Sequence, residues 1–336
     1  MYKKPILDII VPSYKTSKFI DMYPDLLYSE ELEGKVRFLL IDDGSPDDTL
    51  SKIDSLSKRY PNYFVCYTKP NGGHGSVINF GINMAKSVYF KVMDGDDYLD
   101  KNELIKFVTF LESSDFDVVI TKYSKDYISN GRNELCLSWI NSNKEMENVN
   151  ALPTFSIALA SSTFKLSLFK ANSIKVREGV FYEDLEYSFF PLPYIKKIYC
   201  FDSVLYHYIQ YDQPSNGYTQ SITLTSIIKH ASDHNHVMND ILDFYSNIDD
   251  EKRSSIDKYA LDFVSKQATQ NYRYLLLNSS KEAKKSLILF DKKIKRNKGI
   301  NAIVKKNKTI KALRFSKYLS FGLLSKLYKK RFNAGV

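Results

Sequence analysis

Cysteine is scarce in this chain of 336 residues, and long apolar runs are missing. The three cysteines, Cys66, Cys136 and Cys200, are odd in number and widely spaced. This spacing argues against a disulfide framework or a zinc site and fits a reducing compartment. The apolar run at Ile6–Val11 is interrupted by Asp8 and is too short for a signal peptide. No run approaches the roughly 20 residues that cross a bilayer, so we expect a cytoplasmic protein.

Positive charge is concentrated at one end of the chain. Asp291–Arg331 holds fifteen Lys and Arg against one acid, a local net charge of +14, so the rest of the chain carries −5 of the total of +9. From about residue 310 the basic residues alternate with apolar ones: Ile310, Leu313, Leu319, Phe321, Leu323, Leu324 and Leu327. A basic amphipathic segment suits the inner face of the cell membrane, where it would meet anionic lipid.

The basic tail has two other candidate partners, protein and nucleic acid. It can equally pack on the body of the protein or on a second copy, giving a homo-oligomer through the C-terminal helices. No recognition motif accompanies the Lys and Arg residues, so nucleic acid is not an expected partner.

Strand and helix patterns alternate through the first 120 residues. Short apolar runs predict buried strands at Ile6–Val11, Val36–Ile41, Tyr63–Tyr67, Val88–Met93 and Asp117–Thr121. Segments of helical length and period lie between them, at Asp48–Arg59, Gly75–Lys86 and Lys101–Ser113. The alternation predicts an α/β fold with a mostly parallel sheet covered by helices on both faces.

The rest of the chain divides into two parts. Residues 122–224 read as mixed α and β, and Ser161–Phe169 resembles a strand that enters a helix. From residue 225 onward helical patterns dominate, at Ser226–Ser246, Lys252–Asn278 and Lys281–Lys295. We therefore expect one domain at 1–224 and a helical region with a basic tail at 225–336.

Polar residues follow four of the predicted strands. In open α/β sheets, ligands bind outside the carboxyl ends of the strands. One of these clusters, Asp94-Gly95-Asp96-Asp97, places carboxylates on a turn, where they can bind Mg²⁺ or Mn²⁺ together with substrate phosphate. It can also be an acidic turn ahead of the helix near Lys101. The arrangement predicts a single site built from all four strand ends.

A glycine-rich loop, Asn71-Gly72-Gly73-His74-Gly75-Ser76, precedes a predicted helix. Glycines allow close approach of the backbone to a ligand, and helix N–H groups can meet phosphate. The loop matches neither the P-loop nor the dinucleotide fingerprint. A plain loop before a capped helix explains it as well.

Two further candidates lie among aromatic residues. Glu183 and Asp184 lie in Phe181–Tyr187, where apolar neighbours can raise the pKa of a carboxyl group and suit it to act as a general base. The same acids also suit the N-terminus of an ordinary helix. His207 lies in the strand-like run Leu205–Tyr208 and can be a metal ligand or a structural residue.

In order and spacing, these motifs together resemble glycosyltransferase family 2, whose members have the GT-A fold. The matching elements are Ile9–Tyr14, Leu40–Ser45, Asn71-x-Gly73-x-Gly75-Ser76-x-x-Asn79-x-Gly81, Asp94–Asp97, Glu183-Asp184 and Ser221-Ile222-Thr223. The resemblance covers roughly residues 4–225. It implies a GT-A domain at 1–224, with a nucleotide-sugar half at 1–121 and an acceptor half at 122–224.

The resemblance also implies roles for individual residues. Asp184 would be the catalytic base and Glu183 would support donor or acceptor, while Asp96 and His207 would bind Mn²⁺ or Mg²⁺. The nucleotide would be contacted by Pro12, Ser13, Tyr14, Asp42, Asp43, Asn71, Gly73 and Asp94, and the diphosphate by Ser221 and Thr223. Many relatives carry an arginine where this chain has Ile78, and a basic residue where it has Ile209 and Gln210.

The implied function is inverting transfer from a UDP-sugar to a hydroxyl of a glycan, lipid-linked or polymer acceptor in bacterial surface polysaccharide or glycoconjugate synthesis. Two alternatives stand beside it. The first is a catalytically silent nucleotide- or glycan-binding subunit. The lack of basic residues at Ile78, Ile209 and Gln210 favours it, whereas the presence of Asp94, Asp96 and Asp184 disfavours it. A sugar nucleotidyltransferase would need a basic, glycine-rich loop after the first strand, where this chain has Pro12-Ser13-Tyr14-Lys15.

Overall fold

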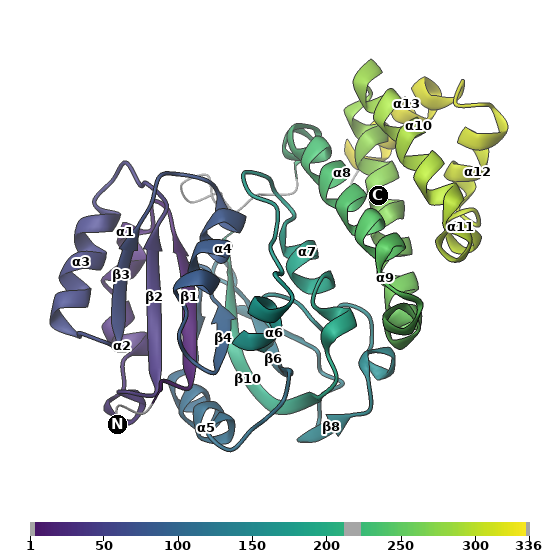
Figure 1. The fold of residues 1–336 in the computed structure, drawn as a ribbon. Coiled ribbons are helices and arrows are strands. Elements are labelled where there is room, and N and C mark those ends of the chain that lie inside the picture. The colour runs from purple at the N-terminus through teal and green to yellow at the C-terminus, as the bar shows by residue number, and fades with distance from the viewer. Residues whose placement is uncertain (1–3, 212–222, 334–336) are drawn as a thin grey trace. The chain divides into compact units, whose positions relative to one another are not determined.

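The computed structural model describes residues 4–211 and 223–333 (Figure 1). The chain groups into two compact units. The first comprises the residues up to 179 and those from 183 to 211, and the second comprises Val180–Tyr182 and the chain from 223 onward.

The first unit contains ten strands in one sheet. They are β1 (Leu7–Ser13), β2 (Val36–Asp42), β3 (Phe64–Thr68), β4 (Tyr89–Val92), β5 (Tyr98–Leu99), β6 (Val118–Tyr127), β7 (Arg132–Cys136), β8 (Lys144–Met146), β9 (Ser162–Lys165) and β10 (Ile198–Gln210). The main path runs β3-β2-β1-β4-β9-β6-β10-β5, with β7 on β6 and β8 on β10. Helices of this unit are α1 (Ser17–Ile20), α2 (Tyr23–Leu27), α3 (Thr49–Arg59), α4 (His74–Met84), α5 (Lys101–Leu111), α6 (Leu166–Ala171) and α7 (Asp184–Phe189).

All five predicted strands are confirmed, and the α/β class with them. β1 to β4 are parallel, as is the pair β6 and β10, whereas β9 runs antiparallel to both β4 and β6. The sheet is therefore mixed in its second half. The antiparallel strands β5, β7 and β8 have two to five residues each, which is too short to give a period in the sequence.

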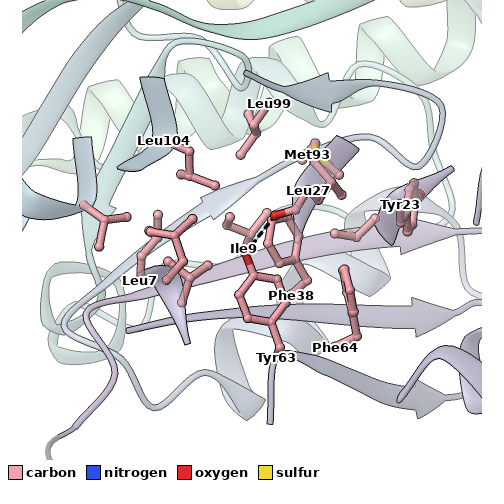
Figure 2. Packing of buried hydrophobic residues seen from close by; sticks show 14 of the residues in the cluster. Leu7, Ile9, Tyr23, Leu27, Phe38, Tyr63, Phe64, Met93, Leu99 and Leu104 are labelled. Carbon is pink, nitrogen blue, oxygen red and sulfur yellow. Dashed lines mark hydrogen bonds between the residues drawn. The ribbon is translucent and has the colours of Figure 1, made fainter. Parts of the chain in front are cut away.

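Both faces of the sheet are buried. On one face, Ile9 and Phe38 pack with residues of α2, α3 and α5, and Tyr63 donates a hydrogen bond to the Leu27 carbonyl at 2.7 Å (Figure 2). Successive residues of a strand point to opposite faces, so Ile10 faces the other way. There it packs against Gly81 of α4, where an added Cβ would come within 2.5 Å of Ile10. The carboxyl ends of the strands are thus held between two packed layers.

The second unit is helical. Its long helices are α8 (Leu224–Asn247), α9 (Asp250–Asn278) and α10 (Lys281–Arg296), followed by α11 (Lys298–Val304), α12 (Lys308–Phe315) and α13 (Phe321–Asn333). The three helices predicted from residue 225 onward are therefore confirmed. A buried carboxylate, Asp291, joins α10 to α12 by accepting hydrogen bonds from Arg314 at 2.7 and 2.9 Å and from the hydroxyls of Tyr272 and Tyr318.

The basic tail packs with one of its faces and exposes the other. Ile310, Leu313 and Phe321 are buried, whereas Leu319 and Leu323 are 83% and 64% exposed. Within residues 4–211 and 223–333, none of the helices combines the length and apolar character that a membrane span requires.

Candidate active site

The ends of β1, β2 and β4 meet at one edge of the sheet, as the sequence predicts. The Asp43 amide, one residue after β2, donates to the Ser13 carbonyl at 2.9 Å. Gly95, after β4, lies against β1 so closely that an added Cβ would approach the Pro12 carbonyl oxygen to 2.7 Å. Only glycine fits there, which brings the acidic turn after β4 beside Pro12 and Ser13.

Asp43 joins this edge to the glycine-rich loop. Its carboxylate accepts hydrogen bonds from the amides of Gly72 and Gly73, at 3.0 and 2.8 Å, and from the Lys69 ammonium at 2.7 Å. Asp43 is buried, and Gly73 has φ +81°, a conformation that favours glycine. The loop after β3 is therefore held by the charged Asp43–Lys69 pair, and no local sequence pattern identifies Lys69 as the partner of Asp43.

The neighbouring residues Asp42 and Tyr14 are also in place. Asp42 is buried and accepts hydrogen bonds from the Ser45 amide and the Thr68 hydroxyl, both at 3.1 Å. Tyr14 is half-buried, with the Lys15 ammonium 5.4 Å from its ring centroid. Asn71 is exposed beside this edge, its backbone amide close to Gly44.

The acidic turn after β4 is held by a buried tyrosine of β10. The Tyr206 hydroxyl accepts a hydrogen bond from the Asp94 amide at 3.1 Å and donates one to Asp97 at 2.5 Å. The Ile209 amide also donates to Asp97 at 2.8 Å. These bonds anchor Asp97 in the interior and leave Asp94 and Asp96 half-buried on the turn.

Asp96 carries charge that the protein only partly balances. Burial, followed by the charge of Asp94, raises the pKa of Asp96 to about 6, while Lys18 and His74 act in the opposite direction. Carboxylates that crowd in this way favour a cation as a neighbour. Lys18 is an exposed cation near the turn. Its ammonium lies 4.7 Å from the ring centroid of Phe19 and 5.7 Å from that of Tyr211.

His74, the first residue of α4, lies between two carboxylates. Its Nε2 is 2.9 Å from Asp94, and its Nδ1 is 2.6 Å from Glu183. Gly75 allows this approach, because an added Cβ there would come within 2.2 Å of the Arg177 carbonyl oxygen. The pattern Asn71-x-Gly73-x-Gly75 leaves position 74 unspecified, so sequence reasoning missed this residue.

Asp184 is the first residue of α7 and Glu183 is its N-cap, and the two side chains differ in environment. Glu183 is buried and held by His74, whereas Asp184 is exposed to solvent. Loss of hydration among surrounding protein atoms, and then the charge of Glu183, raises the pKa of Asp184 to about 6, against the opposing charge of His74. A carboxylate of this kind is ionised at neutral pH and basic enough to accept a proton.

His207 is oriented by its neighbours. Its Nδ1 lies 2.8 Å from Asp126, and its ring stacks on Tyr98 with 4.5 Å between centroids. An ionised carboxylate only accepts, so Nδ1 donates to Asp126, the arrangement found in metal-binding histidines whose non-coordinating nitrogen donates to a carboxylate. Among residues 4–211 and 223–333, no three His, Cys, Asp or Glu side chains gather into a metal-binding group.

Three other positions named from the family resemblance are Ile78, Thr223 and Ser221. Ile78 is fully buried in the layer on β1, so this position faces the core rather than a ligand. Thr223 caps α8 by accepting a hydrogen bond from the Ser226 amide at 3.1 Å, in the second unit. Ser221 lies outside the described residues.

Comparison with known proteins identifies the family. Residues 8–173 match the model of glycosyl transferase family 2. The chain belongs to glycosyltransferase family 2. The matched segment contains β1 to β4 and the turns that follow them, so the strand-end cluster lies in the part of the chain that defines the family.

Characterised relatives cover only part of this family 2 chain. A poly(ribitol-phosphate) beta-glucosyltransferase of Bacillus spizizenii is 26% identical over 170 residues, which are 50% of this chain and 26% of the relative. A chondroitin synthase of Pasteurella multocida is 30% identical over 100 residues, 30% of this chain and 10% of the relative. The chain therefore spans well under two thirds of the length of both relatives.

The fold of the family 2 chain has solved counterparts. The crystal structure of residues 1–349 of S. aureus TarS in complex with UDP-GlcNAc superposes with a TM-score of 0.71, covering 97% of this chain and 92% of that one at 17% identity. A mannosyltransferase from Pyrobaculum calidifontis, in complex with GDP-Man and Mn²⁺, has a TM-score of 0.51 at 15% identity. The predicted GT-A architecture is thereby confirmed.

Proposed function

We propose that this chain is an inverting glycosyltransferase. It would transfer a sugar from a UDP-sugar to a hydroxyl of a glycan, lipid-linked or polymer acceptor in bacterial surface polysaccharide or glycoconjugate synthesis. The observation that carries the proposal is the bridge formed by His74. Its ring contacts Asp94 on the turn at the strand ends and Glu183, the residue before Asp184. The names of the Bacillus spizizenii and S. aureus proteins support a sugar-transfer role and a UDP-sugar donor.

The nucleotide would lie at the edge formed by Pro12, Ser13, Tyr14 and Asp42. Asp43 would accept a hydrogen bond from uracil in addition to holding the loop. A carboxylate has about four lone-pair positions, and three donors reach Asp43 from Lys69, Gly72 and Gly73, so one position remains for a base N–H. Asn71 and Gly73 would flank the nucleotide, Asp94 would face the ribose, and Ser221 and Thr223 would contact the diphosphate.

Asp184 is proposed as the base of a single displacement. Its carboxylate would take the proton of the acceptor hydroxyl while that oxygen bonds to the anomeric carbon from the face opposite the diphosphate. The bond between the anomeric carbon and the diphosphate oxygen breaks in the same step, through an oxocarbenium-like transition state. An α-linked donor therefore gives a β-linked product, with UDP as the leaving group.

The residues on the acidic turn fit a hard divalent cation. Asp96 has a raised pKa because burial and Asp94 leave its charge under-compensated, and the His207 ring is oriented by Asp126 through Nδ1. We propose that Asp96 and His207 would hold Mn²⁺ or Mg²⁺, with the donor diphosphate and water as the other ligands. When bound, such a cation neutralises negative charge on the leaving diphosphate.

A membrane surface is the proposed partner of the tail. Leu323 and Leu327 are exposed and spaced by four residues in α13, so they share one face, and Leu319 is exposed in the turn that precedes this helix. Lys326 and Lys330 are exposed beside them. Exposed apolar side chains flanked by cations suit an anionic lipid surface, and the localisation would be peripheral on the inner face of the cell membrane.

The function is tested by a thermal-shift screen with UDP and a panel of UDP-sugars, each with Mn²⁺, Mg²⁺ or EDTA. A ligand that binds only the folded state stabilises it by about 2.7 kcal/mol at a hundredfold excess over Kd. A metal-dependent shift with UDP and with one UDP-sugar, followed by UDP release on adding acceptor, is the expected result. Nucleotide binding without turnover of any sugar would favour the silent-subunit alternative.

A further inference from the structure

His74 bridges the two acidic parts of the site. It contacts both the acidic turn, through Asp94, and the start of α7, through Glu183, with nitrogen–oxygen distances of 2.9 and 2.6 Å. We propose that His74 is a positioning residue which fixes the separation between the donor-binding turn and the Glu183-Asp184 pair. This inference rests on the proposed function and adds a residue outside the recognised motifs.

The hydrogen bonding requires a particular protonation state. Ionised carboxylates only accept hydrogen bonds, so a ring that bridges two of them must donate from both nitrogens. Burial lowers the pKa of His74, but the charge of Asp94 and the hydrogen bonds to Asp94 and Glu183 outweigh burial and raise it well above the usual value. His74 is therefore a cation shared by the two sides of the site.

The backbone around His74 is fixed on both sides. Asp43 holds the amides of Gly72 and Gly73, and the Gly72 carbonyl accepts a hydrogen bond from the Gly179 amide at 2.9 Å. The loop that carries His74 and the segment leading to Glu183 are thus connected by the backbone as well as by the imidazole. A ring held in this way fixes the position of Glu183, and of the adjacent base Asp184, relative to Asp94.

The proposal predicts a specific pattern of kinetic change. His74→Ala removes the bridge, and His74→Gln keeps a polar group of similar length that cannot donate at both ends. Because small displacements of a positioned group can cost about a hundredfold in rate, we expect kcat to fall by about that factor in His74→Ala and less in His74→Gln. The Kd for UDP, measured by calorimetry with Mn²⁺, should change much less than kcat.

Chemical rescue separates positioning from general support of the fold. His74 is 31% exposed, so free imidazole can reach the space that His74→Ala leaves. We expect added imidazole to restore part of the lost kcat of His74→Ala in a dose-dependent way and to leave the wild type unchanged. His236→Gln, at an exposed histidine of α8 outside the site, serves as the matched control and should keep wild-type values.

The possible outcomes are distinct. A wild type that turns over no UDP-sugar would contradict the proposed function itself. An active wild type with unchanged kcat in both His74 variants would contradict the positioning role. A variant with the melting temperature of the wild type that lost kcat and UDP affinity equally, without rescue by imidazole, would also overturn it.

Discussion

The Lys69 ammonium lies 2.7 Å from the Asp43 carboxylate, and both side chains are largely buried. Asp43 also holds the amides of Gly72 and Gly73, so the pair fixes the loop at the end of β3. Removing one partner of a buried ion pair leaves the other uncompensated, at a cost of about 3–5 kcal/mol. We therefore expect Asp43→Ala to lower the free energy of unfolding by several kcal/mol and to abolish measurable UDP binding.

The control for this prediction separates the fold from the ligand. In Asp43→Asn the amide oxygen can still accept from a glycine N–H, so the variant should fold while its UDP affinity falls by at least about tenfold, which is 1.4 kcal/mol. Denaturant unfolding and calorimetry measure the two effects. Wild-type UDP affinity in a folded Asp43→Asn protein would contradict the role of Asp43 in the nucleotide site.

The proposed base predicts a pH profile. Asp184 must be ionised to accept a proton, and its pKa is raised to about 6 by loss of hydration among surrounding protein atoms and by the charge of Glu183. The rate constant kcat/KM should therefore be level near neutral pH and fall tenfold per unit as the pH drops below about 6. Asp184→Asn should lose transfer by a factor of at least about a hundred and keep its affinity for UDP.

A matched control excludes a general effect of charge. Glu147 is an exposed acid outside the site, and Glu147→Gln should retain both the rate and the acid limb of the profile. Transfer assays from pH 5 to 9, with UDP binding measured in parallel, provide the comparison. Near-normal turnover in Asp184→Asn would refute the assignment of the base.

Metal dependence is predicted to reside in Asp96 and His207. Asp96→Ala should remove the difference in UDP affinity between Mn²⁺ and EDTA, because it deletes the oxygen ligand on the turn. Asp126→Asn should weaken Mn²⁺ binding by about 10–100-fold, since it removes the carboxylate that orients the His207 ring at 2.8 Å. Equal UDP affinity with Mn²⁺ and with EDTA in the wild type would count against the metal.

The sequence predicts the parallel half of the sheet and the acids at its edge, but not the contacts between them. Apolar runs in β1 to β4 carry a clear pattern, and Asp94 and Asp184 lie in short motifs. Tyr206 and His74 follow no local rule: their partners lie 112 and 109 residues away in the chain. Contacts at that separation depend on how the strands are ordered in the sheet, and β9, which joins the two halves, has only four residues.

A buried lysine predicts how stability depends on pH. Lys91 of β4 is fully buried, its ammonium 2.6 Å from the Ala160 carbonyl oxygen, and burial lowers its pKa to about 7. In the unfolded chain the pKa returns to about 10.4, so the unfolded state binds more protons between these values. The unfolding free energy then rises with pH, by at most about 1.4 kcal/mol per unit from this group.

Lys91→Met removes this contribution. The difference in unfolding free energy, wild type minus Lys91→Met, should increase from pH 7 to pH 10 and be constant below pH 7. Lys86 is exposed nearby in the sequence, and Lys86→Met should show no such trend. Urea unfolding at several pH values measures the difference, and a flat difference would show that Lys91 is charged in the folded protein throughout.

The exposed face of the tail predicts binding to anionic membranes. Leu319, Leu323 and Leu327 remain 83%, 64% and 47% exposed while Phe321 is buried, so replacing the three leucines by glutamate should leave the fold of the helical unit intact. The variant should lose the insertion of apolar side chains into the bilayer. The introduced glutamates should also cancel the attraction of nearby lysines to anionic lipid, which is about 1 kcal/mol per lysine. We expect the wild type to pellet with phosphatidylglycerol vesicles, less so at high salt, and the triple variant to stay in solution.

The matched control places three glutamates at exposed apolar positions of the first unit, Leu50, Ile128 and Leu135. This variant carries the same change in charge and should pellet as the wild type does. Sedimentation on phosphatidylcholine vesicles distinguishes apolar insertion from attraction to the headgroup, since only the former persists there. If both triple variants pellet equally, the leucine face is not the membrane contact, and a change in oligomeric state specific to the Leu319, Leu323 and Leu327 variant would instead assign this face to a second copy of the chain.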